Sequence, residues 1–257
     1  MKSYENLKDK VDNAPDMDFG DIINNAIELF KKVWLKGFLT ILILMVAGVV
    51  ASLVFQAIGL AADVSILEQG ISIESLSEFY SMSAIYSLPQ NILMSSISIL
   101  LVSAFYRICK NEVLGLNESD NYFFYFTKDY ISKALMLGII HALITAVAQA
   151  LFLLPYIYAF VPLAYFTIVF ANNPDLKEVD MVKLSFALGN KKWLISFGTM
   201  FVCGIIGVLG IIGCGIGLLF TISIAYLPVF FIYKEVIGFD NRNEIDLIGT
   251  NKDDDTF

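Results

Sequence analysis

A histidine, a threonine and a glutamine recur at helical spacing inside a long apolar stretch. His141 is followed by Thr145 four residues later and by Gln149 eight residues later. Residues four apart lie on one face of a helix, so these side chains form a polar seam. An ionisable side chain within a membrane span is by default a candidate functional residue. Gln56 and Asn91, from two preceding apolar stretches, are the candidates to extend the seam.

The seam has two interpretations. It can line a cavity for a small neutral or amphipathic molecule, or it can hydrogen-bond neighbouring helices together. A proton relay would need titratable partners near His141, and the apolar stretches hold no Asp or Glu away from their ends. We therefore predict that His141 is a neutral hydrogen-bonding residue, neither a relay nor a metal ligand, whose role asparagine can fill.

A second pattern is a series of glycines in the last long apolar stretch: Gly204, Gly207, Gly210, Gly213 and Gly217. A phosphate-binding loop needs polar surroundings and a nearby cation, whereas these glycines lie among Ile, Val and Leu. Glycines also allow helix backbones to approach closely. We therefore interpret them as helix-packing residues.

The sequence lacks the usual signatures of catalysis and metal binding. It contains no HExxH, no CxxC and no paired carboxylates within an apolar stretch, and no nucleophile and base stand at a recognisable spacing. We expect no catalytic residue, no cofactor and no metal, and hence no enzyme. Its three cysteines lie at or inside apolar segments and are expected to pack, and a net charge of −8 disfavours nucleic acid.

The composition defines the elements that must position these residues. The chain has 257 residues, of which 57% are hydrophobic and 16% charged, against about a quarter charged in soluble domains. Windows without Asp, Glu, Lys or Arg cover 37–62, 79–106, 134–174 and 193–233. A helix over either of the last two would reach about 60 Å, twice the hydrocarbon thickness, so each must fold back. Breaks are expected near Leu154-Pro155-Tyr156 and near Gly213-Cys214-Gly215.

The expected fold is an all-α, polytopic membrane helix bundle with six transmembrane helices in three hairpins. The predicted spans are 38–62, 88–108, 134–153, 156–172, 193–212 and 216–235. We expect a single membrane domain over 1–257, with a polar N-terminal tail at 1–18, the bundle at 19–236 and an acidic C-terminal tail at 237–257.

The basic residues predict the orientation. Of the 17 Lys and Arg, six precede span one, four lie in 107–133, four lie in 177–192 and three lie from Lys234 onward, so all stand at alternate connections or at the span ends beside them. Positively charged loops stay in the cytoplasm, so both termini are expected inside. The connection 63–78 carries four acidic residues and no basic one, as an outer loop would.

Amphipathic segments precede the first, third and fifth spans. The first is 19–34, which Asp18 can cap and within which Glu28 can pair with Lys32. The others are marked by two groups of apolar residues: Phe123, Phe126 and Tyr130, then Met181, Leu184 and Leu188. We interpret each hairpin as preceded by a cytoplasmic amphipathic helix, which makes a degenerate threefold repeat. The alternative is that any multispan protein places such stretches beside its helices.

The second half of the chain carries an ordered set of residues: Pro155, then Ala171-Asn172-Asn173-Pro174-Asp175-Leu176, Ser185, Gly189-Asn190-Lys191-Lys192-Trp193, Pro228 and Tyr233-Lys234-Glu235. Over 134–236 the chain resembles an uncharacterised family of six-span bacterial inner-membrane proteins, a domain of unknown function. That family is distantly similar to the membrane domain of some glycerophosphodiester phosphodiesterases. The resemblance implies the fold and a bacterial inner membrane, and it brings no catalytic residues.

These observations leave two hypotheses for function. The first is a non-catalytic assembly, scaffold or accessory subunit, whose partners are the lipid bilayer and other membrane proteins. The alternative is a transporter or channel for a small neutral or amphipathic molecule, which would use the polar seam. A continuous polar path would favour transport, and a packed interior would favour a scaffold.

Overall fold

The computed structural model describes residues 3–60, 72, 87–151, 153–212 and 215–239, and these residues form helices and no strands. Six helices in this part of the chain are long and apolar enough to cross a membrane: Phe19–Ala57, Leu88–Leu114, Lys128–Ala150, Leu154–Asn172, Trp193–Ile212 and Gly217–Val236. The all-α fold with six spanning-length helices is therefore confirmed.

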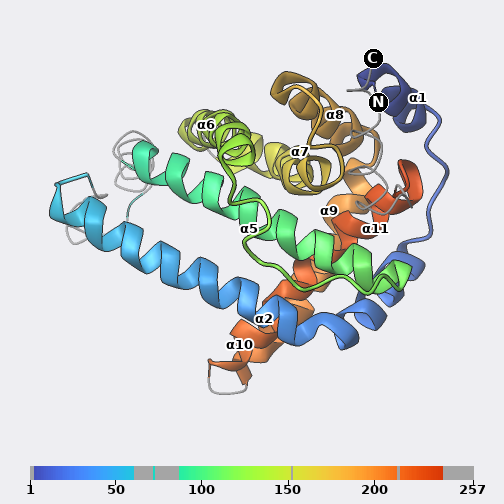
Figure 1. Ribbon diagram of the computed structural model, residues 1–257, viewed down its shortest axis with the longest axis horizontal. Coiled ribbons are helices and arrows are strands. Elements are labelled where there is room, and N and C mark those ends of the chain that lie inside the picture. Colours follow the sequence, from blue (N-terminus) through green and yellow to red (C-terminus); the bar gives the residue numbers. More distant parts are fainter. Residues whose placement is uncertain (1–2, 61–71, 73–86, 152, 213–214, 240–257) are drawn as a thin grey trace, which may run out of the picture.

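Helix α5 (Leu88–Leu114) is the centre of the molecule. Figure 1 shows it between α6 (Lys128–Ala150) and α7 (Leu153–Asn172) on one side and α2 (Phe19–Ala57) on the other. Its most apolar window is 67% buried, the highest share among the six helices. The helix continues past the predicted end at 108 and stops at Gly115, whose φ of 66° suits a residue without a Cβ.

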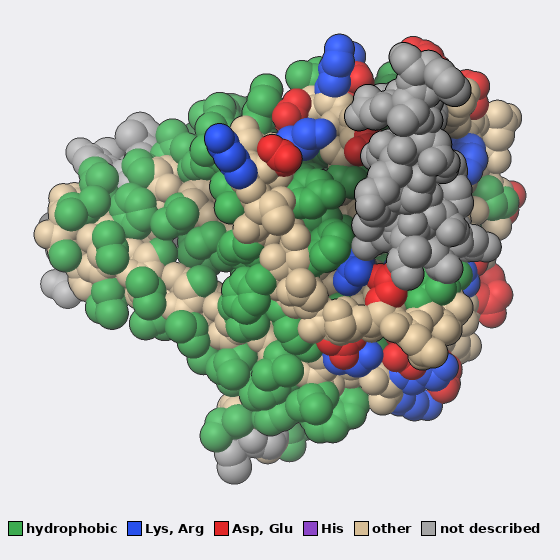
Figure 2. All heavy atoms as spheres, in the orientation of Figure 1, with side chains coloured by type: hydrophobic (Ala, Val, Ile, Leu, Met, Phe, Trp, Pro, Cys, Tyr) green, Lys and Arg blue, Asp and Glu red, His purple; other side chains and the backbone are tan. Residues whose placement is uncertain are grey.

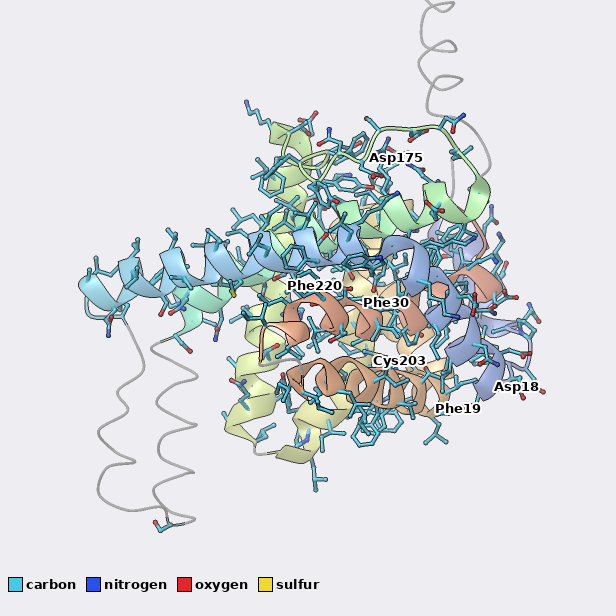
Figure 3. The ribbon with its side chains drawn as sticks, turned by 90° about the horizontal axis from the view of Figure 1, so that it is seen from below. Asp18, Phe19, Phe30, Asp175, Cys203 and Phe220 are labelled. Atoms are coloured by element: carbon cyan, nitrogen blue, oxygen red, sulfur yellow. The ribbon has the colours of Figure 1, made fainter. Side chains whose placement is uncertain are left out.

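Helix α2 joins two predicted elements, the amphipathic segment 19–34 and the span 38–62, into one helix. Its 39 residues rise about 58 Å, which is twice the hydrocarbon thickness, so a membrane can cover only part of it. Figures 1 and 3 show the helix bending between its N-terminal part and the remainder. The apolar face of the first part packs on the bundle, with Ile22, Ala26 and Val33 buried.

The start of α2 follows the sequence prediction closely. The Asp18 side chain accepts a hydrogen bond from the Asp21 backbone nitrogen at 2.9 Å, as an N-cap does. Glu28 pairs with Lys31 at 2.5 Å, not with Lys32 as expected. Figure 3 shows Phe19 and Asp18 at the same end of the molecule. The Phe19 ring packs closely against Gly198, because a Cβ added at this glycine would lie 2.8 Å from the ring.

The three predicted amphipathic segments take three different forms. The first is fused to α2. The second is a turn over 121–126 followed directly by α6, which begins at Lys128, before the predicted start of span three at 134. Only the third is a separate helix, α8 (Glu178–Lys191). It buries the predicted stripe Met181, Leu184 and Leu188 and carries acidic residues in its first turn, which complement the helix dipole.

The N-terminal segment 1–18, expected as a polar tail, contains a docked helix. Helix α1 (Tyr4–Asp12) buries Leu7 and Val11 and packs against α8. Lys191 donates a hydrogen bond to the Asp12 carbonyl at 3.0 Å and Lys192 donates to the Pro15 carbonyl at 2.5 Å. The i, i+4 spacing of Leu7 and Val11 is the signal that could have predicted this helix.

Helix α6 ends at Ala150 and α7 begins at Leu153, so the break lies a few residues before Pro155, which stands in the first turn of α7. Helix α9 (Trp193–Val208) continues as the 3-10 turn η1 (Leu209–Ile212). The last span has three consecutive pieces: α10 (Gly217–Thr221), the 3-10 turn η2 (Ile222–Tyr226) and α11 (Leu227–Val236).

Pro228 explains the change of helix type in the last span. Proline has no N–H to donate to the carbonyl four residues before it, which here is Ile224. The Leu227 N–H bonds to that carbonyl instead, and this i to i+3 bond is the 3-10 pattern.

Some predictions fall outside the described residues. They concern Gly213 and Cys214, the connection 63–78 except Ser72, and the tail beyond Phe239.

Candidate ligand cavity

A cavity of about 960 Å³ lies among α5, α6, α7, α9, η1, η2 and α11. This volume is at the upper end of the roughly 300–1,000 Å³ typical of small-molecule sites. Its walls come from helical segments that are far apart in the sequence, so the cavity is a product of tertiary packing.

One wall is polar and comes from α5 and α6. His141, Thr145 and Gln149 line it from α6, and Asn91 lines it from α5. Two α5 residues that the sequence analysis did not single out, Ser95 and Ser98, extend the wall. Their spacing of four and seven residues from Asn91 is helical and could have identified them. Gln56 is exposed on α2 and does not line the cavity.

His141 contacts both α5 and α7. Its Nδ1 lies 3.1 Å from the Ser95 hydroxyl, and its ring meets Phe166 edge to face with centroids 5.9 Å apart. Among the residues lining the cavity there is no Asp or Glu, and within the described chain no group of His, Cys, Asp and Glu could hold a metal. The surroundings are those of a neutral imidazole bonded to a neighbouring helix.

The contact between Ser95 and His141 pairs a hydroxyl with a base, which sequence spacing could not reveal because the two residues come from different helices. Nucleophilic catalysis also needs a group that orients the imidazole and donors that stabilise an oxyanion. Among the described lining residues there is no carboxylate, and the Ser95 N–H lies inside α5, where the helix uses it.

Thr145 carries an unsatisfied hydroxyl. Its Oγ1 is buried and has no hydrogen-bond partner within the described structure. Leaving a buried hydroxyl unpaired costs about 1–3 kcal/mol, so such a group is unusual unless something else bonds to it. Thr145 lines the cavity one helical turn from His141, but its Oγ1 is itself inaccessible, so the unsatisfied atom lies behind the cavity surface.

Apolar side chains of α9 form another part of the lining. They include Phe197, Met200 and Phe201. Phe201 is 60% exposed and Phe160 of α7 is 42% exposed, although both line the cavity. Residues that are both lining and exposed mark its opening, so the mouth lies between α7 and α9 and is apolar.

Hydrogen bonds join the helices that contribute to the cavity. The Tyr106 hydroxyl donates to the Tyr226 carbonyl at 2.9 Å and joins α5 to η2. The hydroxyls of Tyr165 and Ser196 lie 2.7 Å apart and join α7 to α9.

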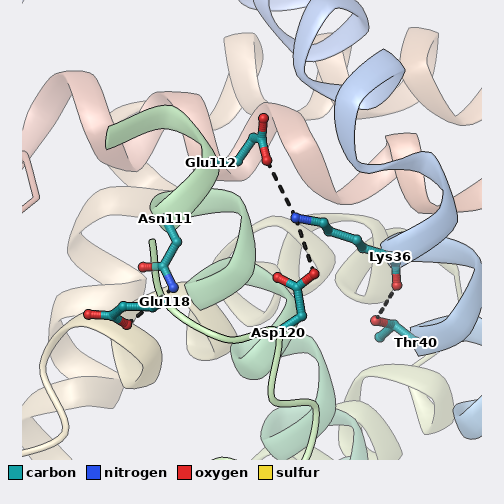
Figure 4. A network of polar contacts seen from close by, with 6 residues as sticks. All are labelled: Lys36, Thr40, Asn111, Glu112, Glu118 and Asp120. Atoms are coloured by element: carbon teal, nitrogen blue, oxygen red, sulfur yellow. Dashed lines mark hydrogen bonds and ion pairs between the residues drawn. The ribbon is translucent and has the colours of Figure 1, made fainter. Parts of the chain in front are cut away.

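A charged network follows Tyr106 in the C-terminal part of α5. Figure 4 shows Lys36 between two carboxylates, 3.4 Å from Glu112 and 3.2 Å from Asp120. Arg107 pairs with Glu118 at 2.5 Å, and its guanidinium lies 4.0 Å from the centroid of the Phe124 ring. These contacts fasten the connection between α5 and α6 to the middle of α2 and to the C-terminal part of α5.

The glycine series divides between packing and cavity. At Gly210 and Gly217 the backbones of η1 and α10 meet so closely that a side chain on either would collide with the other, and a Cβ at Gly207 would lie 3.2 Å from the Ile222 Cα. Gly204 differs from the prediction, because a Cβ there would meet nothing within 4 Å and the residue lines the cavity.

Three glycines outside that series hold helices together: Gly37, Gly138 and Gly189. A Cβ at Gly138 would lie 2.9 Å from the Ser96 nitrogen of α5, and one at Gly189 would lie 2.6 Å from the Pro162 Cα of α7. A Cβ at Gly37 would collide with Ser223. Isolated glycines give no periodic signal, so the sequence analysis missed them.

The residues that carry the family resemblance contact one another and their surroundings. The Asn173 amide donates to the Tyr233 hydroxyl at 2.6 Å, and Trp193 donates to the Tyr158 carbonyl at 3.1 Å. Lys133 donates to the Pro174 carbonyl at 2.5 Å. These contacts connect α7 with α6, α9 and α11, which is a structural role.

Comparison of the chain with protein-family models, with curated proteins and with solved structures found no match. The inference of function therefore rests on the sequence and on the cavity.

Proposed function

We propose that the protein is a non-catalytic integral membrane protein that binds a small, uncharged, largely apolar molecule within its helix bundle, as a transporter for such a molecule does. The observation that carries the proposal is the cavity of about 960 Å³, with a polar wall on α5 and α6 and an apolar wall on α9.

The walls determine which ligands fit. Among the described residues that line this cavity there is no Asp, Glu, Lys or Arg, so a charged ligand would lose its hydration without gaining a counter-ion from them. The mouth at Phe160 and Phe201 is apolar, so entry is easiest for a molecule already dissolved in the bilayer.

A cavity-filling variant tests this proposal. A leucine at Gly204 would project into open space inside the cavity. We expect Gly204→Leu to fold and to lose most labelling by a photoactivatable hexadecane at cavity residues such as Met200 and Phe201, when the protein is reconstituted in phosphatidylcholine bilayers. Labelled positions are read by peptide mass spectrometry.

Val49→Leu is the control, because Val49 is 54% exposed on α2 and is not among the residues that line the cavity. It should leave labelling of the cavity residues unchanged. The proposal fails if hexadecane does not label the cavity in the unmodified protein, or if Gly204→Leu folds and is labelled as before.

A second candidate function is an assembly or accessory subunit, and α2 favours it. The most apolar window of α2 is only 11% buried, and exposed residues run along it to Ile58. Lipid or another membrane helix could cover this surface. If α2 is an assembly surface, cysteines placed along it should cross-link to a partner in native membranes.

We further propose a bacterial inner membrane, on the resemblance over 134–236, with both termini in the cytoplasm. The sidedness is supported by contacts between basic connections and both ends of the described chain. Lys10 of α1 donates to the Ile237 carbonyl after α11 at 2.7 Å, so the two ends lie together. Figure 2 shows the Lys, Arg, Asp and Glu side chains gathered over one part of the molecule, whereas the extension formed by α2 and α5 is hydrophobic.

A further inference from the structure

We propose that the hydrogen bond from Trp193 to the Tyr158 carbonyl holds the mouth of the cavity narrow. Its release would let the first part of α7, up to Pro162, move away from α9. This inference rests on the proposed function only in taking the opening at Phe160 and Phe201 as the route of entry. It starts from a proline inside a helix of spanning length.

Pro162 leaves a backbone carbonyl without its helical partner. In an α-helix the N–H of residue 162 would donate to the carbonyl of residue 158, and proline has no N–H. The Tyr158 carbonyl therefore needs a donor from elsewhere. The Trp193 indole nitrogen of α9 donates to it at 3.1 Å. A bond within one helix is thus replaced by a bond between two helices.

The residues just before Trp193 fit the same part of α7. A Cβ at Gly189 would lie 2.6 Å from the Pro162 Cα, so the end of α8 can approach the proline only because a glycine stands there. The Tyr158 hydroxyl donates to the Asn190 side chain at 2.7 Å. The sequence Gly189-Asn190-Lys191-Lys192-Trp193 therefore forms a joint with α7 at its proline.

This joint lies beside the mouth. Phe160, which is exposed and lines the cavity, stands two residues before Pro162. On α9 the Trp193 ring stacks on Phe197 with centroids 5.0 Å apart, and Phe197 stacks on Phe201 at 6.1 Å. Both phenylalanines line the cavity. The indole bond thus connects the two helices between which the cavity opens.

The missing bond also makes Pro162 the place where α7 can bend, because helices bend where a proline interrupts the hydrogen-bond ladder. Release of Trp193 leaves the Tyr158 carbonyl unpaired, which is costly in apolar surroundings. The bonded state therefore predominates, and the wider mouth is a minor population that a change at Trp193 can increase.

Access to the cavity is measured as the rate at which a lipid-soluble maleimide modifies Val102→Cys. The protein is full-length, without its native cysteines, and reconstituted in phosphatidylcholine bilayers. Val102 of α5 lines the cavity and is 3% exposed, so the reagent must enter to reach it. When opening is fast relative to modification, the rate follows the population of the wider state.

Trp193→Phe keeps an aromatic ring and removes the N–H. We expect it to speed modification by about two- to tenfold, the factor that one net hydrogen bond provides. Trp34→Phe is the matched control, because Trp34 is the other tryptophan of the chain, lies on α2 and does not line the cavity. It should leave the rate unchanged.

Pro162→Ala separates this role from simple packing of the indole ring. Alanine restores an N–H at position 162 that can bond to the Tyr158 carbonyl within α7. In the Pro162→Ala background, Trp193→Phe should change the rate by less than about twofold, because the carbonyl keeps a donor.

The proposal is overturned if Trp193→Phe leaves the rate unchanged while Pro162 is present, or if it raises the rate equally in both backgrounds. Labelling by photoactivatable hexadecane tests binding separately. If hexadecane does not label the cavity, the binding function fails, and the rates of thiol modification still show whether Trp193 controls access.

Discussion

Small residues decide how closely the helices of this protein approach. At the crossing of α5 and α6, Gly138 faces Ser96, and the missing Cβ leaves room for the α5 backbone. In membranes such contacts matter because helix association depends on van der Waals packing and not on the expulsion of water. The same residue type at Gly204 has the opposite consequence, since it leaves space that belongs to the cavity.

This contrast predicts different effects for two identical substitutions. Gly138→Ala places a methyl group 2.9 Å from the Ser96 nitrogen, so the backbones must separate, and we expect a loss of about 1–3 kcal/mol of unfolding free energy. Gly204→Ala should be neutral or stabilise by up to about 1 kcal/mol, because alanine favours helix and meets nothing. Unfolding by SDS, followed by tryptophan fluorescence, measures both. Equal stability of the two variants would contradict this account of the α5 and α6 crossing.

At the scale of elements, helices outside the spanning set fasten the bundle at one end. Helix α1 docks on α8 through Leu7 and Val11, and α8 packs on α7, where Gly189 meets Pro162. Lysines complete these joints by donating to backbone carbonyls, as Lys191 does at the end of α1. The basic residues of these connections are therefore partly structural and do not only set orientation.

The docking of α1 predicts a change in protease sensitivity. Leu7 is 2% exposed, so Leu7→Asp would bury a carboxylate without a partner and should release α1 from α8. We expect trypsin to cleave at Lys8 and Lys10 at least about tenfold faster, since local release by 1.4 kcal/mol already gives that factor. Glu5→Ala, on the exposed side of α1, should leave the cleavage rate unchanged. Equal rates for both variants would show that Leu7 does not hold the helix.

At the scale of the whole molecule, contacts place several basic connections together. Lys36 bridges α2 to the connection after α5, and Lys133 bonds to the turn after α7. Lys10 connects α1 to the end of α11. A chain with six spanning helices returns to its starting side, and these joints between distant parts of the sequence agree with that parity.

Cysteine labelling tests the sidedness. In a variant without the native cysteines, Ser72→Cys should react with a membrane-impermeant thiol reagent in intact cells, because 63–78 has no basic residue and is expected outside. Lys183→Cys, on the exposed side of α8, should react only after the membrane is opened. The reverse pattern would overturn the proposed orientation.

Much of the fold could be read from local sequence properties. Charge-free windows predicted the six spanning helices, and Asp18 predicted a cap that α2 uses, because both depend on residues close together in the chain. The seam of His141, Thr145 and Gln149 was visible for the same reason, since the helical repeat alone puts them on one face. The ends of the helices differ from the predicted ends. Helices α5 and α6 extend into charged residues, and the partners of such residues come from other parts of the chain: Arg107 of α5, for example, pairs with Glu118 in the connection after α5.

The cavity was decided by the tertiary structure. Ser95 meets His141 because α5 and α6 pack side by side. The packing of α9 leaves open space at Gly204, and the position of α2 leaves Gln56 outside the cavity. The distance between these residues along the sequence does not reveal these arrangements. Whether a polar residue joins two helices or lines a cavity depends on which helix stands opposite, and hydrophobic periodicity does not specify a neighbour. The sequence by itself thus determined a six-span helical protein with a polar seam, and the packing of distant helices made that seam the wall of a cavity.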